Sequence, residues 1–334
     1  MRAARFPARG APLEVVDVPK PAVRSGLVLL RVEACGVCHS DVGVQAGRSP
    51  GAQFPRIPGH EVVGTVEEVG PEVPRWKPGD RVGIGWHGWH DGTCPTCQRG
   101  DLFACPQQHI TGTAFDGGYA EFMLAPGQGL AAVPSELSAP EAAPLMCAGV
   151  TTFNALRNSG ARAGDVVGVL GLGGLGHLGV QFAAKMGFRT VAIGRGAEKA
   201  AFATQLGAFE YLDSRAQNCA EELTRLGGAR VILATATDAK AIGDLVDGLS
   251  VHGKLLVVGV PADPIPVFAG TLLRGRRSVQ GWYSGTSIDS EETLRFAVQT
   301  GVRPMVEVFP LAQAPAAFDR MLQGTVRFRA VLTP

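Results

Sequence analysis

The stretch DVVGVLGLGGLGHLG, residues 165–179, constrains the fold more than any other part of the chain. An apolar run at 166–170 enters a glycine-rich turn, and residues 174–186 are predicted to be helical. With G-x-G-x-x-G spacing, the first glycine permits a tight turn, the second lets the backbone approach a pyrophosphate, and the third allows close packing of helix on strand. The helix N-terminus offers N–H groups to phosphate. The candidate cofactor-binding residues of this turn are Gly171, Leu172, Gly173, Gly174, Leu175 and Gly176.

A glycine-rich turn of this kind has two alternative explanations. A purely structural glycine turn would not require the second apolar run that follows the predicted helix, at 190–193. A membrane span would require unbroken apolar helix where the glycine cluster and His177 stand. The sequence therefore favours dinucleotide binding and predicts no membrane partner.

Apolar runs alternate with predicted helices from residue 165 to about residue 284, which predicts an α/β unit with a doubly wound parallel sheet. The runs expected to form its strands are 166–170, 190–193, 231–234, 255–258 and 278–281. Before residue 150 the pattern differs, because short β-rich runs are punctuated by Pro-Gly and Gly-Asp pairs. We expect residues 150–284 to form the dinucleotide-binding domain, and residues 1–149 with 285–334 to form the other domain.

Composition narrows the range of partners and compartments. The 334 residues are 46% hydrophobic and carry a formal net charge of +1, so the chain can bury two cores and offers no basic surface that predicts nucleic-acid binding. The first residues lack the pattern of a secretory signal, which predicts a cytoplasmic protein with reduced thiols. The seven cysteines are then better candidates for metal ligands than for disulfides.

Candidate metal ligands occur in separate segments of the first domain. Cys38 follows a predicted strand, His60 ends a proline-punctuated loop, and Cys147 lies on a predicted helix. Three protein ligands and an open fourth position would let a zinc ion polarise a bound oxygen. Spacing alone does not decide the matter, since any one of these residues could instead be a buried cysteine or a structural histidine.

Several motifs, taken in order, resemble those of the zinc-dependent alcohol dehydrogenases of the medium-chain dehydrogenase/reductase family. They cover nearly the whole chain: CGVCHSD, PGHEVVGTVEEVG, GDRVGIGW, DGGYAEF, EAAPLMCAGVTTFNAL, GLGGLGHLGVQFA and FDRMLQGTVRFRAVL. The resemblance implies a Rossmann domain with a doubly wound parallel sheet, joined to a β-rich, GroES-like catalytic domain that binds zinc.

The resemblance also implies roles for residues near the metal. Cys38, His60 and Cys147 would hold a catalytic zinc, and Glu61 would be able to approach it. Asp41 would orient the His60 imidazole without contacting the metal itself. Ser40 would pass the alcohol proton away from the zinc.

Further residues are implied to contact the cofactor. Thr151 would contact the nicotinamide, His39 and Arg329 would lie near the pyrophosphate, and Val258 is a further candidate. An NAD-preferring site commonly has an acidic residue about 20 residues beyond the glycine turn. Gly194 stands there and Arg195 follows. Because glycine would leave space for a phosphate and arginine could bind it, we expect a preference for NADP(H) over NAD(H). Glu198 reaching the ribose is the alternative.

The sequence departs from the family pattern at two places. The proton relay commonly continues to a histidine three residues beyond Ser40, but Gly43 stands there, so the proton should leave through the cofactor ribose and water. A second, structural zinc is commonly held by four cysteines. Here Asp91 takes the first place, and we expect a Cys3Asp site. Its candidate ligands are Asp91, Cys94, Cys97 and Cys105. His90 and His87 are nearby substitutes for Asp91, and loss of this metal with a locally ordered lobe is the alternative.

Together these features predict a zinc-dependent alcohol dehydrogenase that transfers hydride reversibly between a primary or secondary alcohol and NADP(H). One alternative is a polyol or aldehyde reductase of the same superfamily, and another is a catalytically silent NADP(H)-binding sensor. The expected partners are a small alcohol or aldehyde substrate and further copies of the chain, as a dimer or a tetramer. Trp86, His87 and Tyr283 are candidates for lining the substrate site.

Overall fold

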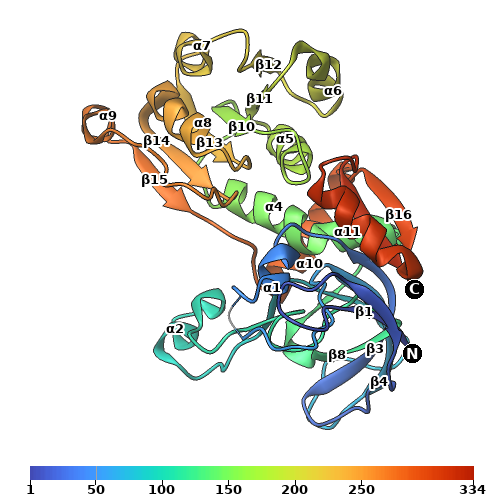
Figure 1. Ribbon diagram of the computed structural model, residues 1–334. Helices are drawn as coiled ribbons and strands as arrows, with labels where there is room; N and C mark the ends of the chain where they lie inside the picture. Colours follow the sequence, from blue (N-terminus) through green and yellow to red (C-terminus); the bar gives the residue numbers. More distant parts are fainter. Residues whose placement is uncertain (50) are drawn as a thin grey trace. The chain divides into compact units, whose positions relative to one another are not determined.

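The computed structural model describes residues 1–49 and 51–334. The chain forms two compact units, each of which is described by itself. Unit 1 comprises Met1–Val150 and Ser284–Pro334, and unit 2 comprises Thr151–Tyr283 (Figure 1). Unit 1 is therefore interrupted by the whole of unit 2.

Unit 2 contains a six-stranded parallel sheet in the order β12-β11-β10-β13-β14-β15. Its strands are β10 (Val166–Leu170), β11 (Arg189–Gly194), β12 (Glu210–Asp213), β13 (Ala229–Ala234), β14 (Leu249–Val257) and β15 (Ser278–Gly281). This confirms the predicted doubly wound parallel sheet, since the strand order reverses at β10. Strand β12 was not predicted from the sequence, because it has four residues and only one buried position, Leu212.

Helix α4 (Val150–Arg157), whose first residue belongs to unit 1, leads into β10, and the other helices of unit 2 connect successive strands of its sheet. These are α5 (Gly176–Lys185), α6 (Ala200–Gln205), α7 (Cys219–Arg225), α8 (Ala239–Asp244) and α9 (Ala269–Gly275), with short 3-10 turns η4 (Ala197–Lys199) and η5 (Leu245–Gly248). The central strand β10 is buried along its whole length, as its apolar run predicts. Side chains such as Val191, Ile232 and Leu255 complete the core.

Unit 1 is built on a seven-stranded sheet with the path β16-β17-β3-β4-β5-β9, and β8 pairs with β3 beside it. Two small sheets, β1-β2 and β6-β7, accompany it. The strands are β1 (Arg2–Arg5), β2 (Glu14–Asp17), β3 (Leu27–Gly36), β4 (Val62–Val69), β5 (Arg81–Ile84), β6 (His87–Trp89), β7 (His109–Ile110), β8 (Phe122–Pro126), β9 (Leu130–Ala132), β16 (Val306–Pro310) and β17 (Arg329–Thr333). The residues after unit 2 thus complete the sheet that the N-terminal residues begin.

Unit 1 also contains helices and helical turns, most of them short. They are α1 (Asp41–Gln45), α2 (Pro95–Gln98), η1 (Leu102–Ala104), η2 (Gly127–Gly129), α3 (Ala139–Pro144), the π-helical turn η3 (Leu145–Gly149), α10 (Ser287–Thr300), η6 (Leu311–Gln313) and α11 (Ala314–Leu322). Helix α3 begins with a capping box, in which the Glu141 carboxylate accepts hydrogen bonds from the backbone N–H and the hydroxyl of Ser138. Among the described residues, no helix is both long and apolar enough to cross a membrane.

Candidate active site

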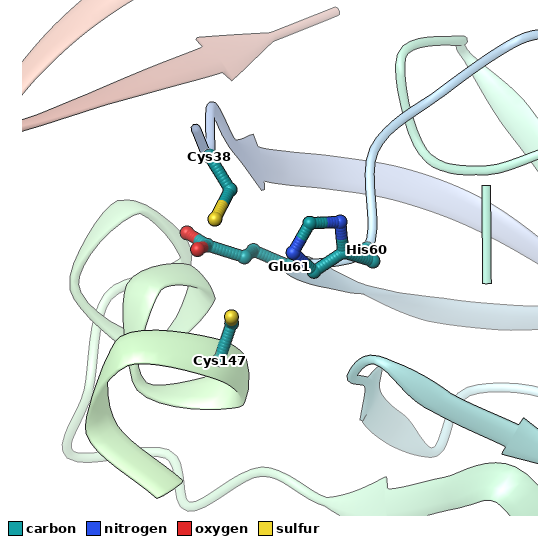
Figure 2. Close-up of side chains that lie close together, drawn as sticks. All are labelled: Cys38, His60, Glu61 and Cys147. Carbon is teal, nitrogen blue, oxygen red and sulfur yellow. The ribbon is translucent and has the colours of Figure 1, made fainter. Parts of the chain in front are cut away.

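Four side chains of unit 1 converge on a common centre. Cys38, His60, Glu61 and Cys147 each offer one ligand atom, and these atoms all lie within 4.8 Å of one another. Figure 2 shows the two sulfur atoms facing each other, with the imidazole and the carboxylate directed between them. The structure thus brings together the residues that the sequence analysis selected for a catalytic zinc. We call them the buried cluster.

The backbone explains why these distant residues meet. In the antiparallel pair β3-β4, Cys35 is the register partner of Val62, so the residues just after β3 and just before β4 lie side by side. Cys38 and His60 occupy those two positions. Cys147 comes from η3, where the chain passes from α3 into α4. A π-helical turn places its side chains differently from a regular helix, and such turns are frequent at functional sites.

The imidazole of His60 is held by a buried carboxylate. Its Nδ1 lies 3.2 Å from Oδ1 of Asp41, whose Oδ2 accepts hydrogen bonds from the Tyr119 hydroxyl at 2.8 Å and from the Cys38 backbone N–H at 3.1 Å. This arrangement directs Nε2 of His60 toward the buried cluster. Burial alone would lower the pKa of His60, but the neighbouring Asp41 and Cys38 raise it well above its usual value.

A hydrogen bond between the two thiols of the buried cluster shifts their pKa values in opposite directions. A hydrogen bond from Cys147 lowers the pKa of Cys38 well below its usual value, against the opposing effect of burial. The same bond raises the pKa of Cys147. One thiolate is therefore formed readily at this position, and a thiolate is the form that binds a metal.

Buried polar atoms without partners indicate what the buried cluster can hold. Nε2 of His60 and Oε2 of Glu61 are both buried, and neither has a hydrogen-bond partner among the residues that the structure describes. Leaving such atoms unpaired is costly unless a ligand or ion satisfies them. Two sulfurs and one imidazole nitrogen are a common donor set for catalytic zinc, so the residues present fit this metal.

Glu61 also forms an ion pair that the sequence analysis did not predict. Its Oε1 meets the guanidinium of Arg329, the first residue of β17, and both residues are buried. Burial raises the pKa of Glu61 to about 7, although Arg329 acts in the opposite direction. We expected Arg329 near the cofactor pyrophosphate, but its charge is engaged with Glu61. The two residues are 268 positions apart, and no local signal in the sequence connects them.

Two further predicted residues lie beside the buried cluster. Ser40 is exposed, and its Oγ lies 3.6 Å from Sγ of Cys38, while His39 is exposed next to it. Gly43 follows in α1, and a Cβ there would lie 2.9 Å from the Ser49 hydroxyl. The space beside Gly43 is therefore too small for a histidine unless Ser49 moves.

Two of the three candidates for lining the substrate site, Trp86 and His87, lie directly before β6 and at its first position. The indole of Trp86 meets the imidazole of His60 edge to face, at 4.8 Å between ring centroids, which places Trp86 beside the buried cluster. His87 stacks on His90, and its Nε2 lies 3.2 Å from the carbonyl oxygen of Leu102. Burial lowers the pKa of His87 to about 4, so this imidazole is neutral at physiological pH. Tyr283 is half exposed in unit 2.

The glycine turn of unit 2 has the geometry that its spacing predicts. Gly171 has a φ of +98°, and a Cβ at Gly176 would overlap the carbonyl oxygen of Gly171. At Gly173, a Cβ would find no atom within 4 Å, so the backbone there borders open space. A backbone that a ligand can approach, directly before α5, fits a dinucleotide pyrophosphate.

The end of β11 differs from the expectation in one respect. We expected Gly194 to leave space for a phosphate, but a Cβ at Gly194 would lie 2.8 Å from the Tyr211 hydroxyl, which donates a hydrogen bond to the Gly196 carbonyl oxygen. Tyr211 therefore fills the space beside Gly194. Arg195 is exposed and forms an ion pair with Asp238. The sequence analysis missed both neighbours because β12 and the loop before α8 supply them.

The remaining cofactor candidates lie in unit 2. Thr151 is buried near the start of α4. Val258 directly follows β14, and its backbone N–H donates to the carbonyl oxygen of Ala234 at 3.1 Å. This bond extends the pairing of β14 with β13 by one residue and fixes the position of Val258 at the carboxyl edge of the sheet.

A second cluster in unit 1 brings together Asp91, Cys94, Cys97 and Cys105, with ligand atoms again within 4.8 Å of one another. The sulfur atoms of Cys94 and Cys105 are 3.9 Å apart. Oδ1 of Asp91 accepts hydrogen bonds from the backbone N–H groups of Cys94 and Thr93, both at 2.8 Å, and these bonds hold the pKa of its carboxyl well below the usual range. We call these four residues the lobe cluster. Its three sulfurs and one carboxylate are a donor set that zinc can accept.

Family models, related sequences and a solved structure that resemble this chain are described as dehydrogenases or their domains. Residues 24–135 match the family model "Alcohol dehydrogenase GroES-like domain", and residues 174–299 match "Zinc-binding dehydrogenase". The chain is 46% identical to alcohol dehydrogenase notN of Aspergillus sp., over 98% of this chain and 96% of that protein. It is 42% identical to an alcohol dehydrogenase of Geobacillus stearothermophilus, over 96% of each. Among solved structures, a cobalt- and zinc-bound thermostable alcohol dehydrogenase from Pyrobaculum aerophilum has a TM-score of 0.88 at 27% identity, covering 100% of this chain and 99% of that one.

Proposed function

Because the chain belongs to the zinc-type alcohol dehydrogenases of the medium-chain dehydrogenase/reductase family, we propose that it transfers hydride between an alcohol and NADP(H) at the buried cluster. The observation that carries this proposal is the convergence of Cys38, His60 and Cys147, with no hydrogen-bond partner for Nε2 of His60 in the described part of the chain. Two thiol ligands and one imidazole leave a coordination position for substrate. When bound there, zinc would supply Lewis acidity toward the substrate oxygen.

Hydrogen bonds and an ion pair hold the proposed zinc ligands in position. Asp41 holds Nδ1 of His60 and so fixes the ring orientation, and Tyr119 and the Cys38 N–H fix Asp41 in turn. Arg329 balances the charge of Glu61, which keeps a second carboxylate oxygen close to the sulfur atoms without leaving a buried charge unpaired. The network limits movement of the ligands during turnover.

Ser40 is the residue placed to accept the substrate proton. Its hydroxyl lies beside Sγ of Cys38 and is exposed, so it can exchange a proton with solvent or with a bound cofactor ribose. Gly43 provides no side chain to continue a relay. Ser40 would therefore release its own hydroxyl proton, to water or to the ribose hydroxyls of a bound cofactor, as it accepts the substrate proton.

The nicotinamide cofactor would accept or donate the hydride. The glycine turn before α5 is the binding site for its pyrophosphate, and Thr151 is the proposed contact for its nicotinamide ring. Arg195, which follows β11, is the proposed contact for a 2′-phosphate. No acidic side chain stands at Gly194 to repel that phosphate.

The proposal is tested with the purified protein, a panel of primary and secondary alcohols, and their aldehydes and ketones. We expect nicotinamide-linked turnover in both directions, loss of turnover after treatment with a zinc chelator, and recovery when zinc is added back. Metal content is measured on the same samples. Cofactor binding without turnover of any substrate, in a protein that lacks zinc, would instead identify the cofactor-binding sensor.

The cofactor preference makes a separate prediction. Replacing Arg195 with glutamine should shift the ratio of kcat/KM for NADP+ over NAD+ toward NAD+ by about tenfold, because a charge-assisted bond to phosphate is lost. The ratio is measured with one alcohol under fixed ionic strength. Gly194→Asp should shift it the same way, but its carboxylate would meet the Tyr211 hydroxyl, so Arg195→Gln is the cleaner variant. A wild-type preference for NAD+ would contradict the assignment.

A further inference from the structure

Arg195, the residue proposed to bind the 2′-phosphate, already forms an ion pair with Asp238. The Arg195 guanidinium contacts Oδ2 of Asp238, and the side chains are 58% and 42% exposed. Arg195 directly follows β11, and Asp238 lies between β13 and α8. The ion pair therefore joins two loops that leave the carboxyl ends of these strands. The carboxyl ends of parallel strands are where ligands bind in this architecture.

Both partners line two neighbouring hollows of unit 2. The larger has a volume of about 810 Å³ and also includes Leu170 and Ile193, from the ends of β10 and β11. The smaller has a volume of about 450 Å³ and includes Asp263. Because Arg195 and Asp238 line both, the ion pair forms part of the wall between them. The larger volume is within the range of sites for small ligands and cofactors.

The two oxygens of Asp238 have different partners. Oδ1 accepts a hydrogen bond from the backbone N–H of Ala241 at 3.0 Å and caps α8, whereas Oδ2 contacts Arg195. The N–H of Ala241, and then Arg195, lower the pKa of Asp238. The carboxylate is therefore ionised at neutral pH, and its second oxygen competes with any anion that approaches Arg195.

We propose that Asp238 is a specificity-determining residue that limits the preference for NADP(H) by competing with the 2′-phosphate for Arg195. This rests on the proposed role of Arg195. A 2′-phosphate must displace Oδ2 of Asp238 and then lies close to a carboxylate that repels it. The ribose of NAD(H) carries no charge at that position and experiences neither effect. Asp238 therefore reduces the affinity for the phosphorylated cofactor selectively.

The chain offers a substitution that separates the two roles of Asp238. Asparagine is as good a helix N-cap as aspartate, so Asp238→Asn keeps the bond to Ala241 while removing the charge that faces Arg195. Asp244→Asn is the matched control, because it removes the same charge from the lining of the larger hollow. Asp244 pairs with Lys240 at 2.5 Å and not with Arg195.

The test measures binding by calorimetry, using the full zinc-loaded chain with adenosine 2′,5′-bisphosphate and with adenosine 5′-monophosphate. We expect Asp238→Asn to bind the bisphosphate about five-fold more tightly than the wild type, in line with the strength of exposed ion pairs. Affinity for the monophosphate should not change, and the gain should shrink at high ionic strength. Asp244→Asn should change the affinity for the bisphosphate by less than about two-fold.

The outcomes distinguish this inference from the cofactor assignment. If Asp238→Asn does not tighten the bisphosphate, or if Asp244→Asn tightens it equally, Asp238 is no competitor. The assignment of Arg195 then still stands, provided that Arg195→Gln weakens bisphosphate binding. If Arg195→Gln leaves bisphosphate affinity unchanged, both the role of Arg195 and the competition by Asp238 are overturned.

Discussion

Replacing Cys38 with alanine should reduce turnover by about a thousand-fold or more, while cofactor binding remains largely intact. The large loss is expected because Lewis-acid assistance contributes several kcal/mol to the barrier, and each 1.36 kcal/mol is about a factor of ten in rate. Cofactor binding should persist because the glycine turn belongs to unit 2, whereas Cys38 belongs to unit 1. Zinc content, turnover and cofactor dissociation constant are measured on one preparation.

Cys35→Ala is the matched control for this experiment. Cys35 is also a buried thiol at the end of β3, but it is not a member of the buried cluster. Its replacement should leave zinc content and turnover within about a few-fold of the wild type, since a buried cysteine packs as a small apolar residue. Full activity in a Cys38→Ala protein without bound zinc would overturn the mechanism.

Asp91→Ala should remove one of two zinc ions per chain and lower the unfolding temperature by about 5 °C. A ligand that binds only the folded state stabilises it in proportion to the logarithm of its concentration over Kd, which gives a few kcal/mol at saturation. Removing one of four ligands weakens that binding, and the lobe cluster then has three thiols without a full coordination shell. Metal analysis and calorimetric unfolding of the wild type and the variant check this result.

Two companion variants test the role of Asp91 further. Asp91→Cys should raise the unfolding temperature, because thiolate is the softer ligand and binds zinc more tightly than carboxylate. Asp101→Ala is the control, since Asp101 is exposed in the same region and its side chain makes no cap bond to η1. A wild-type protein with one zinc per chain and no sulfur-rich metal site would show that the lobe cluster does not bind zinc.

The fold was predictable where a strongly patterned stretch of sequence forms both a buried strand and the turn that follows it. The apolar run 166–170 predicts a buried strand, the glycine spacing predicts its turn, and both appear as β10 and the start of α5. The strand β12 was missed because its burial is set by neighbouring strands and only Leu212 faces the core fully. Short strands of mixed burial carry too weak a pattern for this kind of inference.

The residues of the candidate site were predictable from the sequence, but the ion pairs that they form were not. The motifs indicate Cys38, His60 and Cys147, yet only the folded chain shows that Arg329 is paired with Glu61. The same holds for Arg195. Its neighbours in the sequence indicate no ion-pair partner, whereas in the structure it pairs with Asp238 from another loop. Such contacts depend on how strands and loops meet in space, and no periodicity in the sequence records them.

The interruption of unit 1 by unit 2 has a consequence for the order in which the protein assembles during synthesis. Val150 and Ser284 bound the insertion, so a nascent chain displays β3 and the buried cluster long before β17 emerges from the ribosome. Until then, the end of β3 at Cys35 and Gly36 lacks the partner strand that β17 provides, and the Glu61 carboxylate has no counter-ion. Unit 2, which is continuous, can fold first. The metal-binding residues of unit 1 therefore reach their final environment only after the segment that carries Arg329 has been translated.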